Sequence, residues 1–320
     1  MSGSGPQSVE TPIATSLNVT LLVVAAGGAT TLLWAASHSR SWPGLLASAV
    51  AFSYVNNTVF SLLHEATHGI LHPSGRVNDW LGRLAAAFFP TAYSLQRAFH
   101  LTHHRNNRTE LEQFDYLRPQ DNRLLKLAQW YAIVTGLYWM FPPIACVVYG
   151  VAPRTFELAL FRADDSTVAW QTGADVYFES LEGLSRATVR LEILLTILVQ
   201  AALAMALELT LAGWACCYAA FAVNWSALQY ADHAWSPLDV RDGAWDLRVN
   251  PLVRALFLNY HYHLAHHRHP KVPWIHLPRF VDPSRPRPAF LRIYLEMWRG
   301  PRVLPAPARA TAPPGFPGPG

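Results

Sequence analysis

The sequence predicts an all-α integral membrane protein, with four transmembrane helices, additional interfacial or re-entrant helices, and a histidine-rich cap on the cytoplasmic side. Three observations support this fold class. The 320 residues are 51% hydrophobic and only 14% charged, whereas about a quarter of the residues are charged in a typical soluble domain. Uncharged segments reach the roughly 20 residues that a bilayer crossing requires. The chain also contains 14 histidines, and most of them cluster just outside these segments.

The first two apolar segments predict a transmembrane hairpin. Residues 18–37 carry no charge, and residues 44–63 repeat this length after a short loop that contains Arg40 and Pro43. The polar residues before them, 1–17, have no positively charged region ahead of the apolar stretch, so we expect a flexible tail rather than a cleaved signal peptide.

Two further apolar regions are interrupted. Residues 80–95 form a short, charged segment that is broken by Pro90, which predicts an interfacial or re-entrant element. Residues 127–150 are long enough to cross a membrane, but Pro142 and Pro143 interrupt them. We expect this region to lie in the interface or to dip into it.

The second transmembrane hairpin is predicted over 193–207 and 211–229. If the histidine clusters on both sides of these segments meet at one site, the chain must cross an even number of times between His104 and His233. An alternative, with 127–150 and one long helix as the second pair of crossings, satisfies the same condition.

Both assignments leave Arg40 alone on the far side of the membrane. All the other Lys and Arg residues then lie on the histidine side or in the tails, as the positive-inside rule expects of a cytoplasmic face. The predicted organisation is a flexible tail (1–17), a membrane domain (18–302) and a disordered, Pro- and Gly-rich tail (303–320). Within the membrane domain we expect hairpins over 18–63 and 191–229 and a cytoplasmic cap made of 64–190 and 230–302.

The first histidine cluster follows the second apolar segment. In HEATHG, His64 and His68 are four residues apart, so a helix presents both imidazoles on one face. The same residues match HExxH, the motif of zinc hydrolases. That interpretation accounts for only two of the histidines.

Two more clusters share one spacing, with imidazoles at i, i+3 and i+4. They are His100, His103 and His104 in HLTHH, and His263, His266 and His267 in HLAHH. On a helix this spacing makes one compact patch. Eight imidazoles exceed the four ligands that one zinc ion takes, and imidazole also suits iron and copper. The clusters therefore predict two metal ions.

HEATHG, HLTHH and NYHYHLAHHRHP at 259–270 resemble the three histidine boxes of the membrane fatty acid desaturase superfamily. The resemblance extends from about His64 to Arg279, and VPWIHLP after the third box is similar to the acyl-lipid and sphingolipid desaturase branch. It implies a non-haem di-iron centre with two iron ions, which is reduced by an external electron carrier and activates O2 as co-substrate.

The resemblance also implies a ligand set. A further family histidine follows the last transmembrane helix, and His233 occupies that place. Some members carry an Asn four residues earlier, which binds metal through water, where this chain has Gln229. The nine implied ligands are His64, His68, His100, His103, His104, His233, His263, His266 and His267. Further side chains are expected to support these ligands by hydrogen bonding, among them Gln229, Asn259, His261, Asp115 and Asp232.

Desaturation of a lipid acyl chain, which introduces a C=C bond, is the first functional hypothesis. Hydroxylation or ketolation of a lipid or carotenoid by the same di-iron chemistry is the alternative, because histidine boxes do not report where the substrate hydrogens lie. A metal transporter is disfavoured, since it would place polar ligands inside the spanning segments, which here hold none of the clustered histidines at mid-depth.

The expected partners are the membrane, a lipid or acyl substrate, and an external electron donor such as ferredoxin or cytochrome b5 with its reductase. Steering of an acidic donor and binding of anionic lipid headgroups explain the basic residues equally well. These residues are Arg105, Arg108, Arg118, Arg123, Lys126 and the stretch from Arg279 to Arg302. A net charge of +4 without a basic stripe excludes nucleic acid.

Overall fold

The computed structural model describes residues 10–158, 161–162 and 172–304. This part of the chain is built from helices, with one two-stranded sheet, and confirms the all-α prediction. Residues 1–9 and 305–320, which belong to the two predicted tails, lie outside the described residues.

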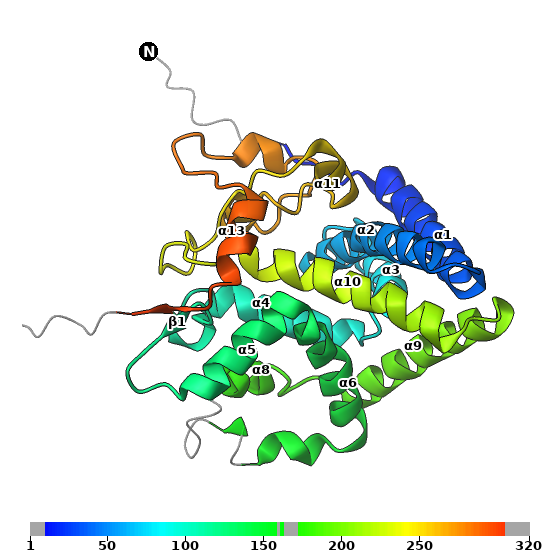
Figure 1. Ribbon diagram of the computed structural model, residues 1–320, viewed down its shortest axis with the longest axis horizontal. Coiled ribbons are helices and arrows are strands. Elements are labelled where there is room, and N and C mark those ends of the chain that lie inside the picture. Colours follow the sequence, from blue (N-terminus) through cyan, green and yellow to red (C-terminus); the bar gives the residue numbers. More distant parts are fainter. Residues whose placement is uncertain (1–9, 159–160, 163–171, 305–320) are drawn as a thin grey trace, which may run out of the picture.

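Helices α1 (Thr15–His38) and α2 (Trp42–His68) form the first hairpin and pack along each other (Figure 1). The turn between them is set by Ser41, whose side chain accepts a hydrogen bond from the Gly44 amide at the start of α2. At its other end, α2 stops at Gly69, whose φ of 72° gives the left-handed conformation that favours glycine.

Helices α9 (Arg186–Ala206) and α10 (Leu211–Ala231) form the second hairpin. In the described part of the chain, α1, α2, α9 and α10 are the four unbroken helices that are long and apolar enough to cross a membrane. They cover the four predicted segments. Helix α10 packs against α1, α2 and α5, whereas α9 exposes apolar side chains that include Leu194, Ile197 and Leu198, as a lipid-facing helix does.

The predicted single element over 80–95 consists of parts of two helices, α3 (Gly75–Phe88) and α4 (Tyr93–Asn106). The chain turns between them at Pro90, whose φ is 23°. The Phe88 carbonyl at the end of α3 accepts hydrogen bonds from Asn56 in α2 and Tyr218 in α10. Side chains from both hairpins therefore satisfy the broken helix end.

The predicted element over 127–150 is also two helices, α5 (Arg123–Thr135) and α6 (Phe141–Val151), joined by η2 (Leu137–Met140) and bent by 94°. The prediction placed the interruption at the two prolines, and this was wrong. The chain bends at Gly136, with φ of 90°, where a Cβ would lie 2.6 Å from the Val223 amide nitrogen of α10. Pro142 and Pro143 lie in the first turn of α6, where proline is tolerated.

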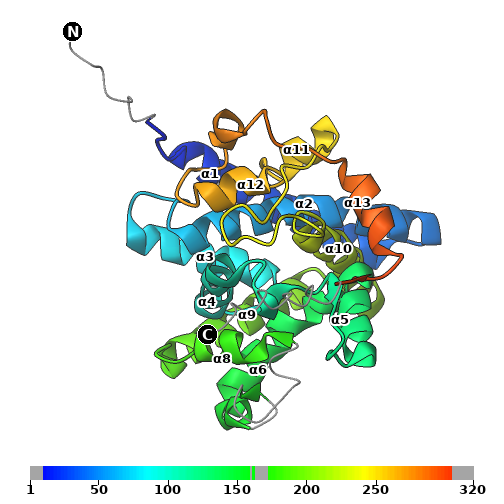
Figure 2. The same ribbon diagram turned by 90° about the vertical axis from the view of Figure 1, so that its left-hand side faces the viewer.

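Shorter elements complete the described chain. They are η1 (Glu110–Glu112), β1 (Tyr116–Leu117), η3 (Pro153–Glu157), α8 (Ala174–Glu179), α11 (Pro251–Leu256), α12 (His263–Arg268), η5 (Leu277–Phe280), α13 (Phe290–Met297) and β2 (Arg302–Val303). The two strands pair in parallel, which holds the end of the described chain beside the segment that follows α4. Figure 2 shows α4, α8 and α12 on the side of the molecule that faces the viewer.

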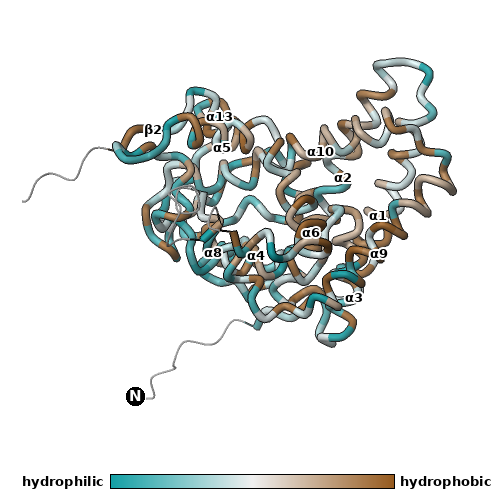
Figure 3. Tube along the Cα trace, turned by 90° about the horizontal axis from the view of Figure 1, so that it is seen from below, coloured by the Kyte–Doolittle hydropathy of each residue, from teal (hydrophilic) through white to brown (hydrophobic). Residues whose placement is uncertain are grey.

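Aromatic side chains form the core between the two hairpins. Phe60 of α2 contacts Phe89, which follows α3, with ring centroids 5.1 Å apart, and it contacts Trp225 of α10, with ring centroids 5.5 Å apart. Because Phe60 precedes His64 by about one helical turn, this core sets the position of the first histidine cluster. Figure 3 shows hydrophobic residues concentrated along α1, α6 and α9, and mostly hydrophilic residues around α4 and α8.

Candidate metal centre

All nine predicted histidines meet in two adjacent groups. The first histidine group contains His64, His68, His100, His104 and His266, and the second contains His103, His233, His263 and His267. Within each group, one ring nitrogen per residue lies within 4.8 Å of all the others.

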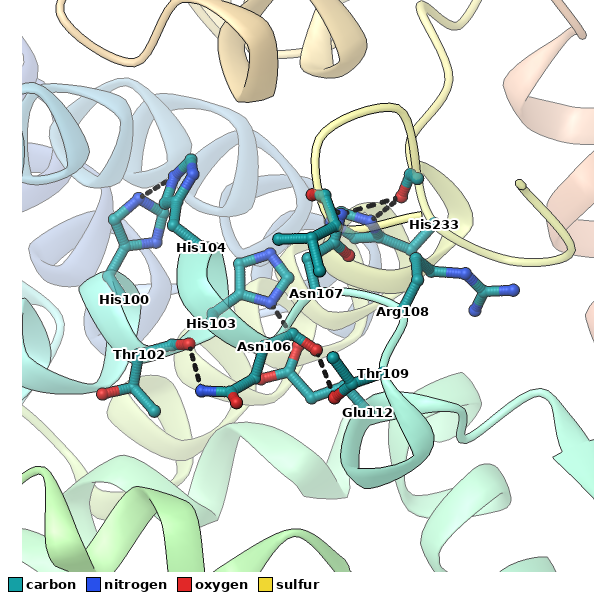
Figure 4. Close-up of polar contacts among 12 residues, drawn as sticks. His100, Thr102, His103, His104, Asn106, Asn107, Arg108, Thr109, Glu112 and His233 are labelled. Carbon is teal, nitrogen blue, oxygen red and sulfur yellow. Dashed lines mark hydrogen bonds and ion pairs between the residues drawn. The ribbon is translucent and has the colours of Figure 1, made fainter. Parts of the chain in front are cut away.

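Each HxxHH cluster is divided between the groups, so the predicted single patch per cluster was wrong. His100 and His104 of α4 join the first group, whereas His103 turns to the second (Figure 4). Consecutive residues are about 100° apart around a helix, so neighbouring histidines point in different directions. In α12 the pattern is reversed, because the i, i+4 pair enters the second group and His266 enters the first.

Nitrogen–nitrogen distances in the first group suit a shared metal ion. His68 Nε2 and His100 Nε2 are 2.7 Å apart, and His104 Nε2 lies 3.1 Å from His100 Nε2 and 3.0 Å from His266 Nε2. Two nitrogens bound at right angles to one ion, with bonds of about 2.0–2.1 Å, lie about 2.9 Å apart. His64 Nε2 is buried without a hydrogen-bond partner among the described residues, so it is also available to the ion.

In the second group, outer partners orient the rings. His103 Nδ1 lies 2.7 Å from Glu112 Oε2, and His233 Nδ1 lies 2.8 Å from the Gly243 carbonyl oxygen. A histidine that donates from Nδ1 presents Nε2 to a metal. Within the described structure, Nε2 of His233 and of His267 is buried and has no hydrogen-bond partner.

Sequence reasoning missed three of these supporting residues. Glu112 and Gly243 contact the rings directly, and the Asn107 side chain donates hydrogen bonds to the carbonyls of Gly243 and Val240. The polar residues shortly after HLTHH were the available signal for Asn107 and Glu112. No local pattern marks Gly243, because it contributes only a backbone carbonyl.

The electrostatics of the centre favour neutral imidazoles and a bound cation. Burial, reinforced by neighbouring histidines, lowers the pKa of His233 and His263 well below the ordinary value. The same holds for the pKa of His100, His104, His266 and His267. The neutral ring is the form that binds metal.

Asp232 adds a buried carboxyl group to the second group. Its Oδ2 lies 3.4 Å from His263 Nδ1 and its Oδ1 lies 3.7 Å from His233 Nε2. Neither oxygen has a hydrogen-bond partner among the described residues, and burial raises the pKa of Asp232. A cation held by the second group would compensate the negative charge of the ionised Asp232 carboxylate. With one group of histidines for each ion, the residues present fit two metal ions.

The other predicted supporting residues bond elsewhere. The Gln229 amide exchanges hydrogen bonds of 2.9 and 3.1 Å with the Tyr260 hydroxyl. Asn259 bonds to Arg254 and to the Trp274 carbonyl. His261 lies outside both groups, and its ring packs on Tyr262 with centroids 4.0 Å apart.

Asp115 belongs to a buried network that joins the segment after α4 to the end of α10. It accepts hydrogen bonds from Arg108 at 2.7 Å and from the Tyr230 hydroxyl at 2.8 Å, while its second oxygen accepts from the Trp235 amide. Arg108 also donates to the Ser236 carbonyl. This network fixes the segments that carry His103 and His233 relative to each other.

The HExxH interpretation fails on the position of its glutamate. Glu65 is 2% exposed, and its Oε2 accepts a hydrogen bond of 3.0 Å from the Trp274 amide. A carboxylate held by backbone in this way is poorly placed to act as the general base of a zinc hydrolase. His64 and His68 also share their group with three further histidines.

A cavity of about 90 Å³ adjoins the histidines. His100, His103, His233 and His263 line one part of it, together with Glu112 and Gln229. The remaining lining is mainly aromatic or aliphatic and comes from α4, α5, η2, α6, α8 and α10: Phe99, Ile133, Tyr138, Phe141, Tyr177, Trp225 and Tyr230.

Comparison with known proteins gives one family. The family model for fatty acid desaturase matches residues 40–300 and includes all nine clustered histidines. Among curated proteins, none matches the chain. Because the family match covers most of the sequence, the chain belongs to the fatty acid desaturase family, a group of di-iron oxidoreductases.

Proposed function

We propose that this protein is an O2-dependent di-iron oxidoreductase of the membrane that introduces a C=C bond into a lipid acyl chain. The observation that carries the proposal is the pair of mostly buried histidine groups beside a largely apolar cavity. The four apolar helices supply the membrane context from which a lipid substrate would come.

The first and second histidine groups would each hold one iron ion, with the nine histidines as ligands. When bound and reduced, the two irons supply the activation of O2 that removes hydrogen from an unactivated C–H bond. Burial lowers the pKa of the imidazoles and keeps them neutral, so they would not compensate the positive charge of bound ions. The Asp232 carboxyl group, 3.4 Å from His263 Nδ1, would do so at the second group once a bound cation displaces its proton.

The cavity walls would hold the substrate. Phe99, Phe141 and Trp225 give it apolar sides that exclude water and orient a methylene toward the histidines. Of the polar residues that line it, Glu112 and Gln229 are engaged with His103 and Tyr260, whereas Gln96 Oε1 is buried without a hydrogen-bond partner among the described residues. The walls nearest the second histidine group therefore need no polar group on the substrate, which suits an acyl methylene at that place.

We place the histidine groups on the cytoplasmic side. If each hairpin crosses the membrane twice, the end of α2 and the end of α10 lie on the same side; His68 is the last residue of α2, and His233 follows α10 by two residues. The opposite turn between α1 and α2 contains Arg40. This distribution follows the positive-inside rule.

The electron donor would be ferredoxin or cytochrome b5, and the structure narrows the surface that it can use. Arg108 and Lys126 are 2% and 1% exposed, so neither offers its side chain to an acidic donor or to anionic lipid headgroups, the two partners that their basic character suggested. Arg105 and Arg123 are exposed and remain candidates for docking an acidic carrier.

Product analysis tests the proposal. The purified protein in lipid, supplied with iron, ferredoxin and its reductase, is incubated with acyl lipids under labelled dioxygen, and products are analysed by mass spectrometry. Loss of two hydrogens without labelled oxygen in the product supports the desaturase. Labelled oxygen retained in the lipid would instead identify the hydroxylase or ketolase, and a matched anaerobic reaction is the control.

A further inference from the structure

The sequence of residues 151–189 contains no recognisable catalytic motif. The structure nevertheless brings one side chain of this segment, Tyr177, to the metal centre. Helix α8 (Ala174–Glu179) packs against α4. The ring of Tyr177 in α8 meets the ring of Phe99 in α4 edge to face, with centroids 5.4 Å apart. Tyr177 and His103 both line the cavity.

A continuous chain of two hydrogen bonds connects Tyr177 to the second histidine group. The Tyr177 hydroxyl donates to Glu112 Oε1 at 2.8 Å, and Glu112 Oε2 lies 2.7 Å from His103 Nδ1. Glu112 is 4% exposed, so water does not substitute freely for either partner. Each carboxylate oxygen therefore has one side-chain donor.

Removal of the hydroxyl would leave Oε1 of a buried carboxylate facing an apolar ring. A buried acceptor without a donor is costly, and the carboxylate would rotate to find another partner. Its second oxygen would then leave the line of the His103 Nδ1–H bond. The position of the His103 ring thus depends on the Tyr177 hydroxyl, to which it is connected through two hydrogen bonds.

We propose that Tyr177 is a positioning residue for the second metal ion. Its hydroxyl holds Glu112 in the orientation that accepts from His103 Nδ1–H, and this directs His103 Nε2 into the second histidine group. The inference rests on the proposed di-iron function. The inference goes beyond that function because it gives a residue of α8, which contains none of the clustered histidines, an effect on the second metal site and none on the first.

The expected asymmetry follows from the division of the histidines. His103 is the ligand that Glu112 contacts, and it belongs to the second group. Loss of an outer partner of a metal ligand typically lowers metal affinity by about 10- to 100-fold. Tyr177→Phe acts through one additional bond, so we expect about a tenfold loss at the second site, and about a hundredfold loss for Glu112→Gln.

The test uses the full chain loaded with ⁵⁷Fe, with Mössbauer spectra to distinguish the two irons and a chelator to measure iron release. Tyr177→Phe should change the spectrum of one iron and speed its release about tenfold, while the other iron is unchanged. Tyr149→Phe is the matched control. Its hydroxyl bonds to the carbonyls of Leu181 and Leu184, so this variant loosens the same segment without touching Glu112.

A double variant separates positioning from general packing. If Tyr177 acts through Glu112, adding Tyr177→Phe to Glu112→Gln should cause no further loss. Equal effects on both irons, additive losses in the double variant, or an equal effect of Tyr149→Phe would each overturn the proposal. Because Glu112→Gln is expected to affect the same iron, it tests the chain of bonds even if Tyr177→Phe folds poorly.

Failure of this inference is distinguishable from failure of the proposed function. If the unmodified protein does not bind two irons, the di-iron proposal itself is wrong. If it binds two irons and Tyr177→Phe releases both at the unmodified rates, only the role of Tyr177 is refuted.

Discussion

Replacing Gly243 by alanine is expected to detach His233 from its backbone partner and to weaken metal binding at the second histidine group. The added Cβ would lie 2.2 Å from the Asp239 carbonyl oxygen and 2.3 Å from Arg108 Cγ. Ordinary contact begins at 3.4 Å, so the methyl and the Asp239 carbonyl must move apart by about 1.2 Å. A neighbour that belongs to the backbone cannot simply change rotamer to make this room.

A shift of that size is larger than the His233 hydrogen bond tolerates. Moved directly away, the Gly243 carbonyl would go from 2.8 Å to about 4.0 Å from His233 Nδ1, beyond hydrogen-bond distance. Overpacking of this kind costs about 1–3 kcal/mol of stability. Loss of an outer partner lowers metal affinity by about 10- to 100-fold.

Metal titration of the detergent-purified protein, together with thermal unfolding of the metal-free form, measures both effects. Gly75→Ala is the control, because its Cβ would meet nothing within 4 Å and its φ is not positive. If Gly243→Ala binds both ions as tightly as Gly75→Ala and unfolds at the same temperature, the assignment of Gly243 as a support of His233 is refuted.

Three further outcomes are expected. His103→Ala and His266→Ala each remove a ligand from a different group, so elemental analysis should show about one metal ion per chain in each instead of about two; loss of both ions from either variant would contradict separate sites. Arg108→Ala leaves the Asp115 carboxylate buried without its cation, and chemical denaturation should show a loss of about 3–5 kcal/mol, whereas a loss below about 1 kcal/mol would contradict a structural role. The buried histidines have pKa values below the 6.5 of the unfolded chain, so unfolding takes up protons as the pH falls below about 6.5. The metal-free protein should then lose about 1.4 kcal/mol per pH unit for each histidine protonated on unfolding, and a melting temperature that stays constant from pH 7 to pH 5 would refute this.

The membrane helices were predictable because crossing a bilayer is a local requirement. An uncharged stretch of about 20 residues satisfies it without reference to the rest of the chain, and α1, α2, α9 and α10 cover the four predicted segments. The interruption near residue 140 was misplaced for the opposite reason. Gly136 bends the chain because α10 passes within contact distance of it, and no neighbour in the sequence reports that approach.

The sequence by itself determined eight of the histidines that gather, because their residue type and helical spacing are local properties that already predict metal ligation; His233, which belongs to no cluster, followed only from the resemblance to the family. Only the tertiary structure decided how they divide, since α4 and α12 must face each other before His103 and His266 can enter opposite groups. It also decided that Glu112, Gly243 and Tyr177 support the second group and that Arg108 is buried. Contacts between residues that are far apart in the chain depend on how the helices pack against one another, and no single segment of the sequence contains that information.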